Sequence, residues 1–256
     1  MHGSIFPIKQ DRDPPDPTGV GVGDGIQLAG TSWNFDQAAA SFDQHVVRSV
    51  PQLNEQRKFV ARLARFFLRQ DARVVELGVS TGGLAEAVLR QIDERRIRYI
   101  GLDISTAMVQ HAGRRLAADA RFSAEVCDIL SYQFDPVALV LSYYTLQFVA
   151  VGQREALLRR IHAALTPGGA LVVYEKTIAA DPRVQDMLSQ LYCDFKLDQG
   201  FSAQEVLNKT KSLQGLMEPC TSEWNKALLR RCGFSVVETI FRNHCFEGYL
   251  AIKGDS

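Results

Sequence analysis

After residue 70, short apolar runs alternate with longer stretches in which apolar residues recur every three or four positions. The short runs predict strands at residues 73–77, 99–103, 124–126, 138–142 and 170–174, and two more at 235–241 and 245–252. The longer stretches predict helices at 83–91, 105–118, 153–165 and 222–232. This alternation is typical of βαβ units, whose parallel strands share one sheet with helices on both faces. The pattern therefore predicts an α/β, Rossmann-like fold with a mostly parallel seven-stranded sheet.

Two helical patterns precede the first strand, between residues 34 and 69, and Pro51 separates them. In the second, residues 54–69, four apolar side chains are expected to face inward: Val60, Leu63, Phe66 and Phe67. A basic stripe, which we expect to be a solvated helix face rather than a phosphate-binding surface, consists of Lys58, Arg62, Arg65 and Arg69. Residues 1–30 hold four prolines and six glycines without apolar periodicity. We expect them to be a flexible arm, and residues 31–254 to be the folded domain.

A further segment, residues 181–217, interrupts the alternation of strands and helices. Asp181 followed by Pro182 is typical of a helix start, and Ser202 with Glu205 fits a capping box. These signals predict an inserted pair of helices, which we expect to act as a lid or a dimerisation arm.

Composition excludes several classes of protein. The 256 residues are 46% apolar, enough for a substantial core, and 29 Lys and Arg balance 29 Asp and Glu, so no nucleic acid partner is expected. The longest uncharged stretch, residues 137–153, is too short and too polar to predict a membrane span. The five cysteines form no C-x-x-C pair, so we expect no disulfide framework and no metal site, and we expect a cytoplasmic location.

The first predicted strand of the sheet opens into a glycine-rich turn that holds Glu76, Gly78 and Gly82. Glycines allow the main chain to approach a ligand closely, and the next helix offers free N–H donors, although a plain tight turn would also use glycine. The spacing E-x-G-x-x-x-G differs from the pyrophosphate-binding G-x-G-x-x-G. It resembles the first motif of class I S-adenosylmethionine-dependent methyltransferases.

Two acids follow the next two predicted strands. Asp103 ends the second, where nucleoside-binding folds place a carboxylate for the ribose hydroxyls, and Asp128 follows the third. Asp103 as a mere helix cap is the weaker alternative, because Ser105 already supplies the cap. Since ligands of open α/β sheets bind at the carboxyl ends of the strands, these residues and the glycine turn predict one cofactor site.

Several blocks in the same order resemble the carboxy-S-adenosylmethionine synthase family, over roughly residues 33–253. The blocks lie at residues 33–36, 48–51, 145–148, 165–171, 175–176, 194–196 and 200–202. The resemblance implies S-adenosylmethionine as cofactor, a homodimer, and the use of S-adenosylmethionine and prephenate as substrates. The cofactor-binding residues that we expect are Glu76, Gly78, Val79, Ser80, Gly82, Asp103, Ile104, Met108, Asp128, Ile129, Ser142 and Tyr143. The substrate-binding residues that we expect are Trp33, Arg48, Tyr192 and Thr210.

The chain departs from this family where a second carboxylate would be held. Leu53 stands where the resemblance implies a tyrosine, and Thr210 where it implies the carboxylate-binding arginine. A threonine hydroxyl offers one neutral hydrogen bond in place of a guanidinium, although Lys209 or Lys211 could substitute as a point charge. These differences argue against carboxy-S-adenosylmethionine synthesis by this chain, but that activity stays open as an alternative.

Tyr143 and Tyr144 follow the fourth strand of the sheet, and we expect one of them to be catalytic, because an aromatic face attracts a sulfonium. The other reading is that one of the two only packs in the core. Methyl transfer to a small-molecule acceptor is the function that we predict. The alternatives are reaction at the aminocarboxypropyl chain, including ring closure, with release of methylthioadenosine; carboxy-S-adenosylmethionine synthesis; and a regulator that binds the cofactor without turnover.

Overall fold

The computed structural model describes residues 27–29, 32–34, 42–92 and 95–255. One sheet of seven strands, in the order β5-β4-β3-β6-β7-β9-β8, organises the described chain. β9 is antiparallel to both of its neighbours, β7 and β8, and the other neighbouring strands are parallel. The strands are β3 (Ala72–Leu77), β4 (Ile97–Asp103), β5 (Phe122–Val126), β6 (Val137–Tyr143), β7 (Leu165–Lys176), β8 (Val236–Asn243) and β9 (Phe246–Ile252). This arrangement confirms the predicted fold class.

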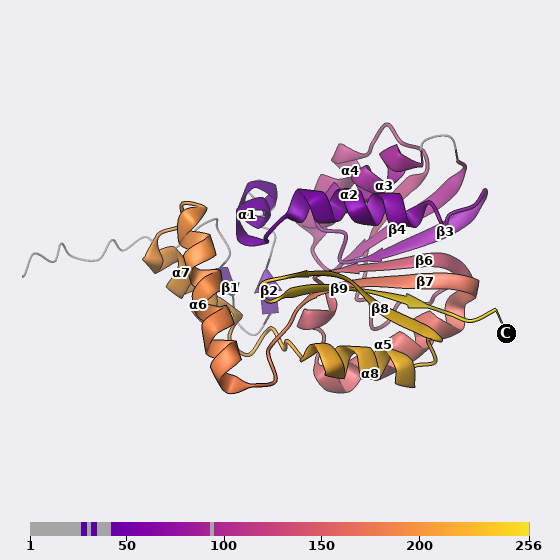
Figure 1. Ribbon diagram of the computed structural model, residues 1–256. Helices are drawn as coiled ribbons and strands as arrows, with labels where there is room; N and C mark the ends of the chain where they lie inside the picture. The colour runs from indigo at the N-terminus through magenta and orange to yellow at the C-terminus, as the bar shows by residue number, and fades with distance from the viewer. Residues whose placement is uncertain (1–26, 30–31, 35–41, 93–94, 256) are drawn as a thin grey trace, which may run out of the picture.

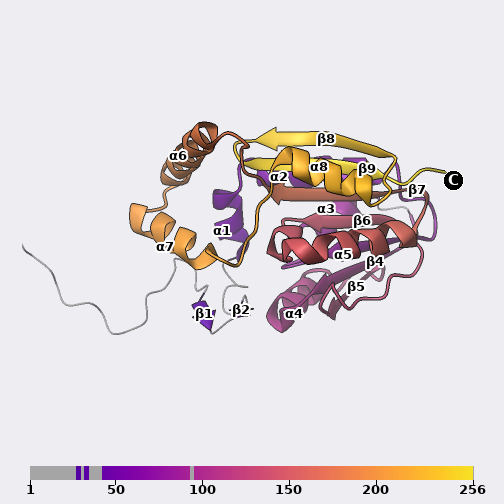
Figure 2. The same ribbon diagram turned by 90° about the horizontal axis from the view of Figure 1, so that it is seen from below.

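Helices cover both faces of the sheet (Figures 1 and 2). On one face, α2 (Leu53–Ala64), α3 (Gly83–Gln91) and α4 (Thr106–Arg115) pack over a core that contains Val60, Val88 and Leu139. On the other face, α5 (Val151–Ala164) and α8 (Ser222–Arg231) pack over a second core, which contains Leu157 and Leu171. The central strands β3 and β6 contribute to both cores, because successive side chains point to opposite faces of a strand.

Three helices lie beyond the carboxyl ends of the parallel strands (Figure 1). They are α1 (Phe42–Ser49) and the predicted inserted pair, α6 (Pro182–Asp198) and α7 (Ala203–Leu213). Asp181 caps α6, with Pro182 in its first turn, and Ser202 and Glu205 form the capping box of α7. A 3-10 turn, η1 (Leu146–Phe148), follows β6 at the same end of the sheet. None of the described helices is both long enough and apolar enough to cross a membrane.

The structure corrects two expectations about the N-terminal part. β1 (Gln27–Ala29) pairs with β2 (Ser32–Asn34), so Asn34 is extended rather than the start of a helix. The rest of residues 1–41 lies outside the described residues, and the flexible arm stays a prediction. Phe66 does not face inward but is 67% exposed, because α2 ends at Ala64 and the chain leaves the helical path. The basic stripe is exposed to solvent, as predicted.

Candidate active site

A cavity of about 710 Å³ opens at the carboxyl ends of the parallel strands. Its walls come from α1, the turns after β3 and β4, the loop after β5, the segment after β6, and the inner sides of α6 and α7. The volume lies toward the upper end of the range of about 300 to 1,000 Å³ that is usual for small-molecule sites. A nucleoside cofactor and a second small molecule can therefore share it. In the part of the chain that the structure describes, no cluster of His, Cys, Asp or Glu could hold a metal ion.

The glycine turn passes so close to the next segment that only glycine fits at position 78. Gly78 has φ +71°, and a Cβ there would lie 2.3 Å from Oγ1 of Thr145, whose hydroxyl donates to the carbonyl of Leu77 at 2.7 Å. Ser80 and Gly82 also have positive φ angles, and Gly82 precedes the first turn of α3. These left-handed residues fold the backbone into a tight cradle at the start of a helix.

Asp103 is held in place by the backbone of two turns. Its carboxylate oxygens accept N–H bonds from Ser80 and Ser105, both at 2.9 Å, so the ends of β3 and β4 are joined through this side chain. Ser105 caps α4 as expected, accepting from the N–H of Met108. Asp103 and Met108 both line the cavity, which places a carboxylate beside the glycine turn, as ribose binding requires.

The loop after β5 supplies the next part of the wall. Asp128 accepts the N–H of Leu130 at 2.9 Å, which shapes the loop. Ile129 lines the cavity, as does the largely exposed Ile104 after β4. A carboxylate and two apolar side chains in one cavity wall can receive a flat base with an exocyclic amino group.

Glu76 is buried at the base of the cavity. Burial raises its pKa to about 8, although the hydroxyl of Tyr99, which donates to it at 2.8 Å, and the charge of Arg57 act in the opposite direction. With its pKa at about 8, the side chain is mostly protonated at neutral pH in the protein without a ligand. An ammonium group in the cavity would favour the ionised form.

Tyr143 and Tyr144 share one hydrogen-bond acceptor. Both hydroxyls donate to Oε1 of Gln56, at 2.9 and 2.8 Å, and Nε2 of Gln56 donates to the carbonyl of Pro51 at 2.8 Å. Tyr144 has φ +62°, which breaks the strand alternation and places its ring 4.8 Å from that of Tyr143. Burial raises the pKa of both phenols well above the usual value for tyrosine, so both stay protonated. Both residues line the cavity, so neither is only a core residue.

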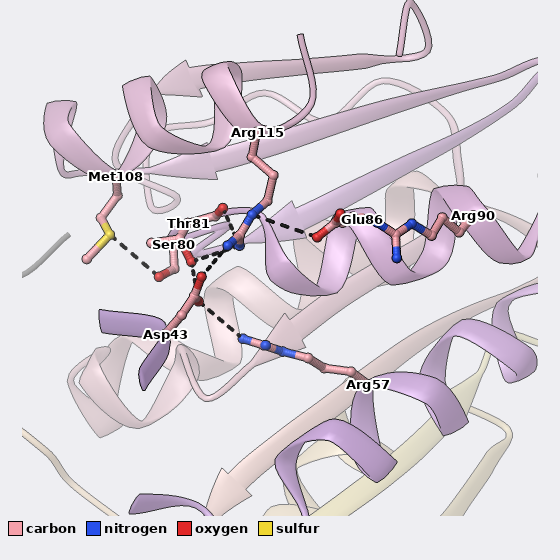
Figure 3. A network of polar contacts seen from close by, with 8 residues as sticks. All are labelled: Asp43, Arg57, Ser80, Thr81, Glu86, Arg90, Met108 and Arg115. Carbon is pink, nitrogen blue, oxygen red and sulfur yellow. Dashed lines mark hydrogen bonds and ion pairs between the residues drawn. The ribbon is translucent and has the colours of Figure 1, made fainter. Parts of the chain in front are cut away.

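An ion-pair network fastens α1 over the glycine turn (Figure 3). Asp43 pairs with Arg115 of α4, lies 3.8 Å from Arg57, and accepts the hydroxyl proton of Thr81 at 2.7 Å. Burial alone would raise the pKa of Asp43, but the hydrogen bonds from Arg115 and Thr81 and the nearby positive charges outweigh it and lower the pKa. The carboxylate thus stays charged and holds α1 against α4 and the turn before α3.

Thirteen of the predicted site residues lie around the cavity. They are Glu76, Gly78, Val79, Ser80, Asp103, Ile104, Met108, Asp128, Ile129, Tyr143, Tyr144, Tyr192 and Thr210. Gly82 is the N-cap residue of α3, and Ser142 is buried within β6. Arg48 does not line the cavity; it donates to the carbonyl of Gln199 and lies over the ring of Phe201. The side chain of Trp33 lies outside the described residues.

Sequence reasoning missed the roles of Lys176 and Lys196, which line the cavity, and of Gln56, which accepts the hydroxyl protons of Tyr143 and Tyr144. Gln56 had a detectable signal, because it lies one turn before Val60 and so places a polar group on the apolar face of α2. Lys176 and Lys196 belong to two of the blocks that resemble the family, but no feature of the sequence near either lysine predicts that their side chains lie close together.

Comparison with known proteins agrees with this geometry. A family model described as a methyltransferase domain matches residues 74–169. A carboxy-S-adenosyl-L-methionine synthase of Staphylococcus epidermidis is 33% identical over 86% of this chain and 97% of the relative, and that of Nitratiruptor sp. is 37% identical over 86% and 93%.

Solved structures show the same fold. Human N-acetylserotonin methyltransferase in complex with S-adenosylmethionine superposes with a TM-score of 0.60 at 20% identity, covering 86% of this chain and 56% of that one. Phosphoethanolamine N-methyltransferase 2 of Haemonchus contortus, also bound to S-adenosylmethionine, gives 0.60 at 19% identity, with 86% and 57% covered. By its sequence relatives, the chain belongs to the carboxy-S-adenosyl-L-methionine synthase family, within the class I methyltransferase-like enzymes whose cofactor is S-adenosylmethionine.

Proposed function

We propose that the protein transfers the methyl group of S-adenosylmethionine to a small-molecule acceptor. The observation that carries this proposal is the placement of two neutral tyrosines in the same cavity as the glycine turn and Asp103. A bound S-adenosylmethionine supplies an activated methyl group and its own leaving group. The chain's residues then need to orient the two partners and exclude water rather than provide strong acid or base catalysis.

The cofactor-binding assignments follow from the contacts around the turn. Asp103 would accept the ribose hydroxyls, Asp128 with Ile104 and Ile129 would hold the base, and Gly78, Val79 and Ser80 would face the methionine part. Glu76 lies where it can bind the ammonium group of that part.

Tyr143 and Tyr144 would hold the reacting centre. Each hydroxyl proton points to Gln56, so the oxygen lone pairs remain available as acceptors. The two rings pack against each other and against Tyr174, and both residues line the cavity. An aromatic face next to a sulfonium contributes about 0.5 to 2 kcal/mol, with the larger values in desolvated sites. Because both phenols stay protonated, we assign them orientation and charge stabilisation, not proton abstraction.

The contacts of Thr210 favour methyl transfer over the family's carboxy transfer. Its hydroxyl donates to the carbonyl of Val206 at 2.9 Å, so the proton that would bind a second carboxylate is already used. Leu53, at the position where the resemblance implies a tyrosine, is buried and presents only carbon atoms to the cavity.

The products of S-adenosylmethionine test the proposal. The protein is incubated with methyl-labelled S-adenosylmethionine and the small-molecule fraction of a cell extract, with and without prephenate, and the products are separated by chromatography with mass detection. We expect S-adenosylhomocysteine together with a labelled small molecule. Methylthioadenosine, carboxy-S-adenosylmethionine, or binding without any turnover would each contradict methyl transfer and identify one of the alternatives.

We also propose that a second copy of the chain covers α6. Val184, Met187 and Leu191 form one exposed apolar stripe on this helix, at 45%, 62% and 53% exposure. Such a stripe is typical of an interaction surface. We expect a dimer in sedimentation equilibrium, and we expect Met187→Glu to weaken it at least tenfold. Phe66→Glu, at a similarly exposed position just after α2, should leave the dimer unchanged. A monomeric wild-type protein would overturn this proposal.

A further inference from the structure

Two lysines from distant parts of the chain meet in the wall of the cavity. Lys176 ends β7 and Lys196 lies in the last turns of α6, and both line the cavity. Their ammonium groups lie 4.8 and 4.4 Å from the centre of the Tyr192 ring. The hydroxyl of Tyr192 donates to the carbonyl of Ser49 at 2.9 Å, which fixes the ring between α1 and α6. Tyr192 thus holds both cations at one place.

Within the described ranges, neither ammonium group has an acidic partner. No carboxylate lies within ion-pair distance of Lys176 or Lys196, although Lys196 is only 7% exposed. The ring of Tyr192 gives each a cation–π contact, but a ring does not neutralise two charges. The titratable groups that face Lys196 are Lys176, Cys193, Cys245 and Tyr192, and none of the four is a carboxyl group.

Two cations brought together without a counter-ion form a site for an anion. Burial, together with the charge of Lys176, lowers the pKa of Lys196 to about 8. An oxyanion between the two ammonium groups would remove the repulsion and keep Lys196 protonated. The surrounding Tyr192 and Phe246 rings, 5.2 Å apart, offer apolar surface for the rest of such a molecule.

We propose that Lys176 and Lys196 form an oxyanion-binding subsite that selects acceptors carrying a carboxylate or a phosphate group. This inference rests on the proposed function, because it assigns a chemical class to the acceptor. It places the anionic end of the acceptor against α6 and β7. The other end then reaches toward Tyr143 and Tyr144, since Tyr143, Tyr144, Tyr192 and Phe246 pack in one cluster.

Calorimetry with small probes tests the subsite. Benzoate, phenyl phosphate and benzyl alcohol are titrated separately into the protein saturated with S-adenosylhomocysteine. We expect at least one of the two anions to bind at least tenfold more tightly than benzyl alcohol, and the preference between benzoate and phenyl phosphate distinguishes a carboxylate from a phosphate acceptor. Binding should weaken as the pH rises through and above 8, because Lys196 then loses its proton.

Lys176→Met and Lys196→Met should each weaken anion binding at least tenfold, and Lys196→Met should remove the pH dependence near 8. Lys58→Met, an exposed lysine of α2, serves as the matched control and should change nothing. An ammonium group buried without a counter-ion destabilises the fold, so Lys196→Met should have the same melting temperature as the wild type or a higher one. If Lys196 had only a structural role, its replacement would lower the melting temperature.

Equal binding of benzyl alcohol and the anions, no binding of either anion, or unchanged binding in both lysine variants would overturn the subsite. If S-adenosylhomocysteine itself does not bind, the proposed function fails, whatever the anions do. The two failures are therefore distinguishable in the same titration series.

Discussion

Replacing Asp103 by alanine is expected to weaken S-adenosylmethionine binding at least about 100-fold. A hydrogen bond to a charged group contributes about 1.5 to 3 kcal/mol, and the carboxylate is placed to accept two ribose hydroxyls. The variant also loses the acceptor for the N–H groups of Ser80 and Ser105, so the turns after β3 and β4 lose the bridge between them. Calorimetric titration of the purified variant with S-adenosylmethionine measures the effect.

Asp103→Asn separates the two contributions, because its amide oxygen can still accept one backbone N–H but carries no charge. We expect intermediate affinity for it. Asp135→Ala, an exposed carboxylate that pairs with Arg73, is the control and should bind the cofactor like the wild type. An affinity of Asp103→Ala within threefold of the wild-type value would remove the basis for the ribose assignment.

Gly78→Ala is expected to destabilise the protein by about 2 to 6 kcal/mol and to impair cofactor binding as well. The φ angle of +71° costs a non-glycine residue about 1 to 3 kcal/mol, and overpacking costs about 1 to 3 kcal/mol more. The side chain of Thr145 cannot move aside without loss of stability, because its hydroxyl donates a hydrogen bond to the carbonyl of Leu77. Urea unfolding gives the stability, and calorimetry gives the affinity.

Gly113→Ala in α4 is the matched control. No atom lies within 4 Å of a Cβ at this position, and alanine is the better helix former by up to about 1 kcal/mol, so the control should be as stable as the wild type or more stable. In the Gly78→Ala background, Thr145→Ala should recover the steric part of the loss and leave the φ strain. Equal stability of Gly78→Ala and Gly113→Ala would show that the close approach at the turn does not constrain the chain.

Part of the site was predictable because its signals are local. Glu76, Gly78 and Asp103 stand at strand ends, and in a parallel sheet those ends meet at one edge whatever the details of packing. The caps of α6 and α7 were predictable for the same reason, since Asp181 and Ser202 satisfy backbone groups only two or three residues away. In contrast, the left-handed conformation of Tyr144 has no local signal, and it alone brings both tyrosine rings to the same side.

The sequence by itself determined the α/β fold, the carboxyl edge at which the site forms, and the family to which the turn and its acids belong. Periodicity, capping and glycine placement depend on interactions between residues close in the chain. Only the tertiary structure decided that Gln56 joins the two tyrosines, that Asp43 and Arg115 fasten α1, and that Lys176 and Lys196 share a wall of the cavity. Those contacts join segments 20 to 88 residues apart, and side chains at such separations meet only after the packing of helices against the sheet has fixed their positions.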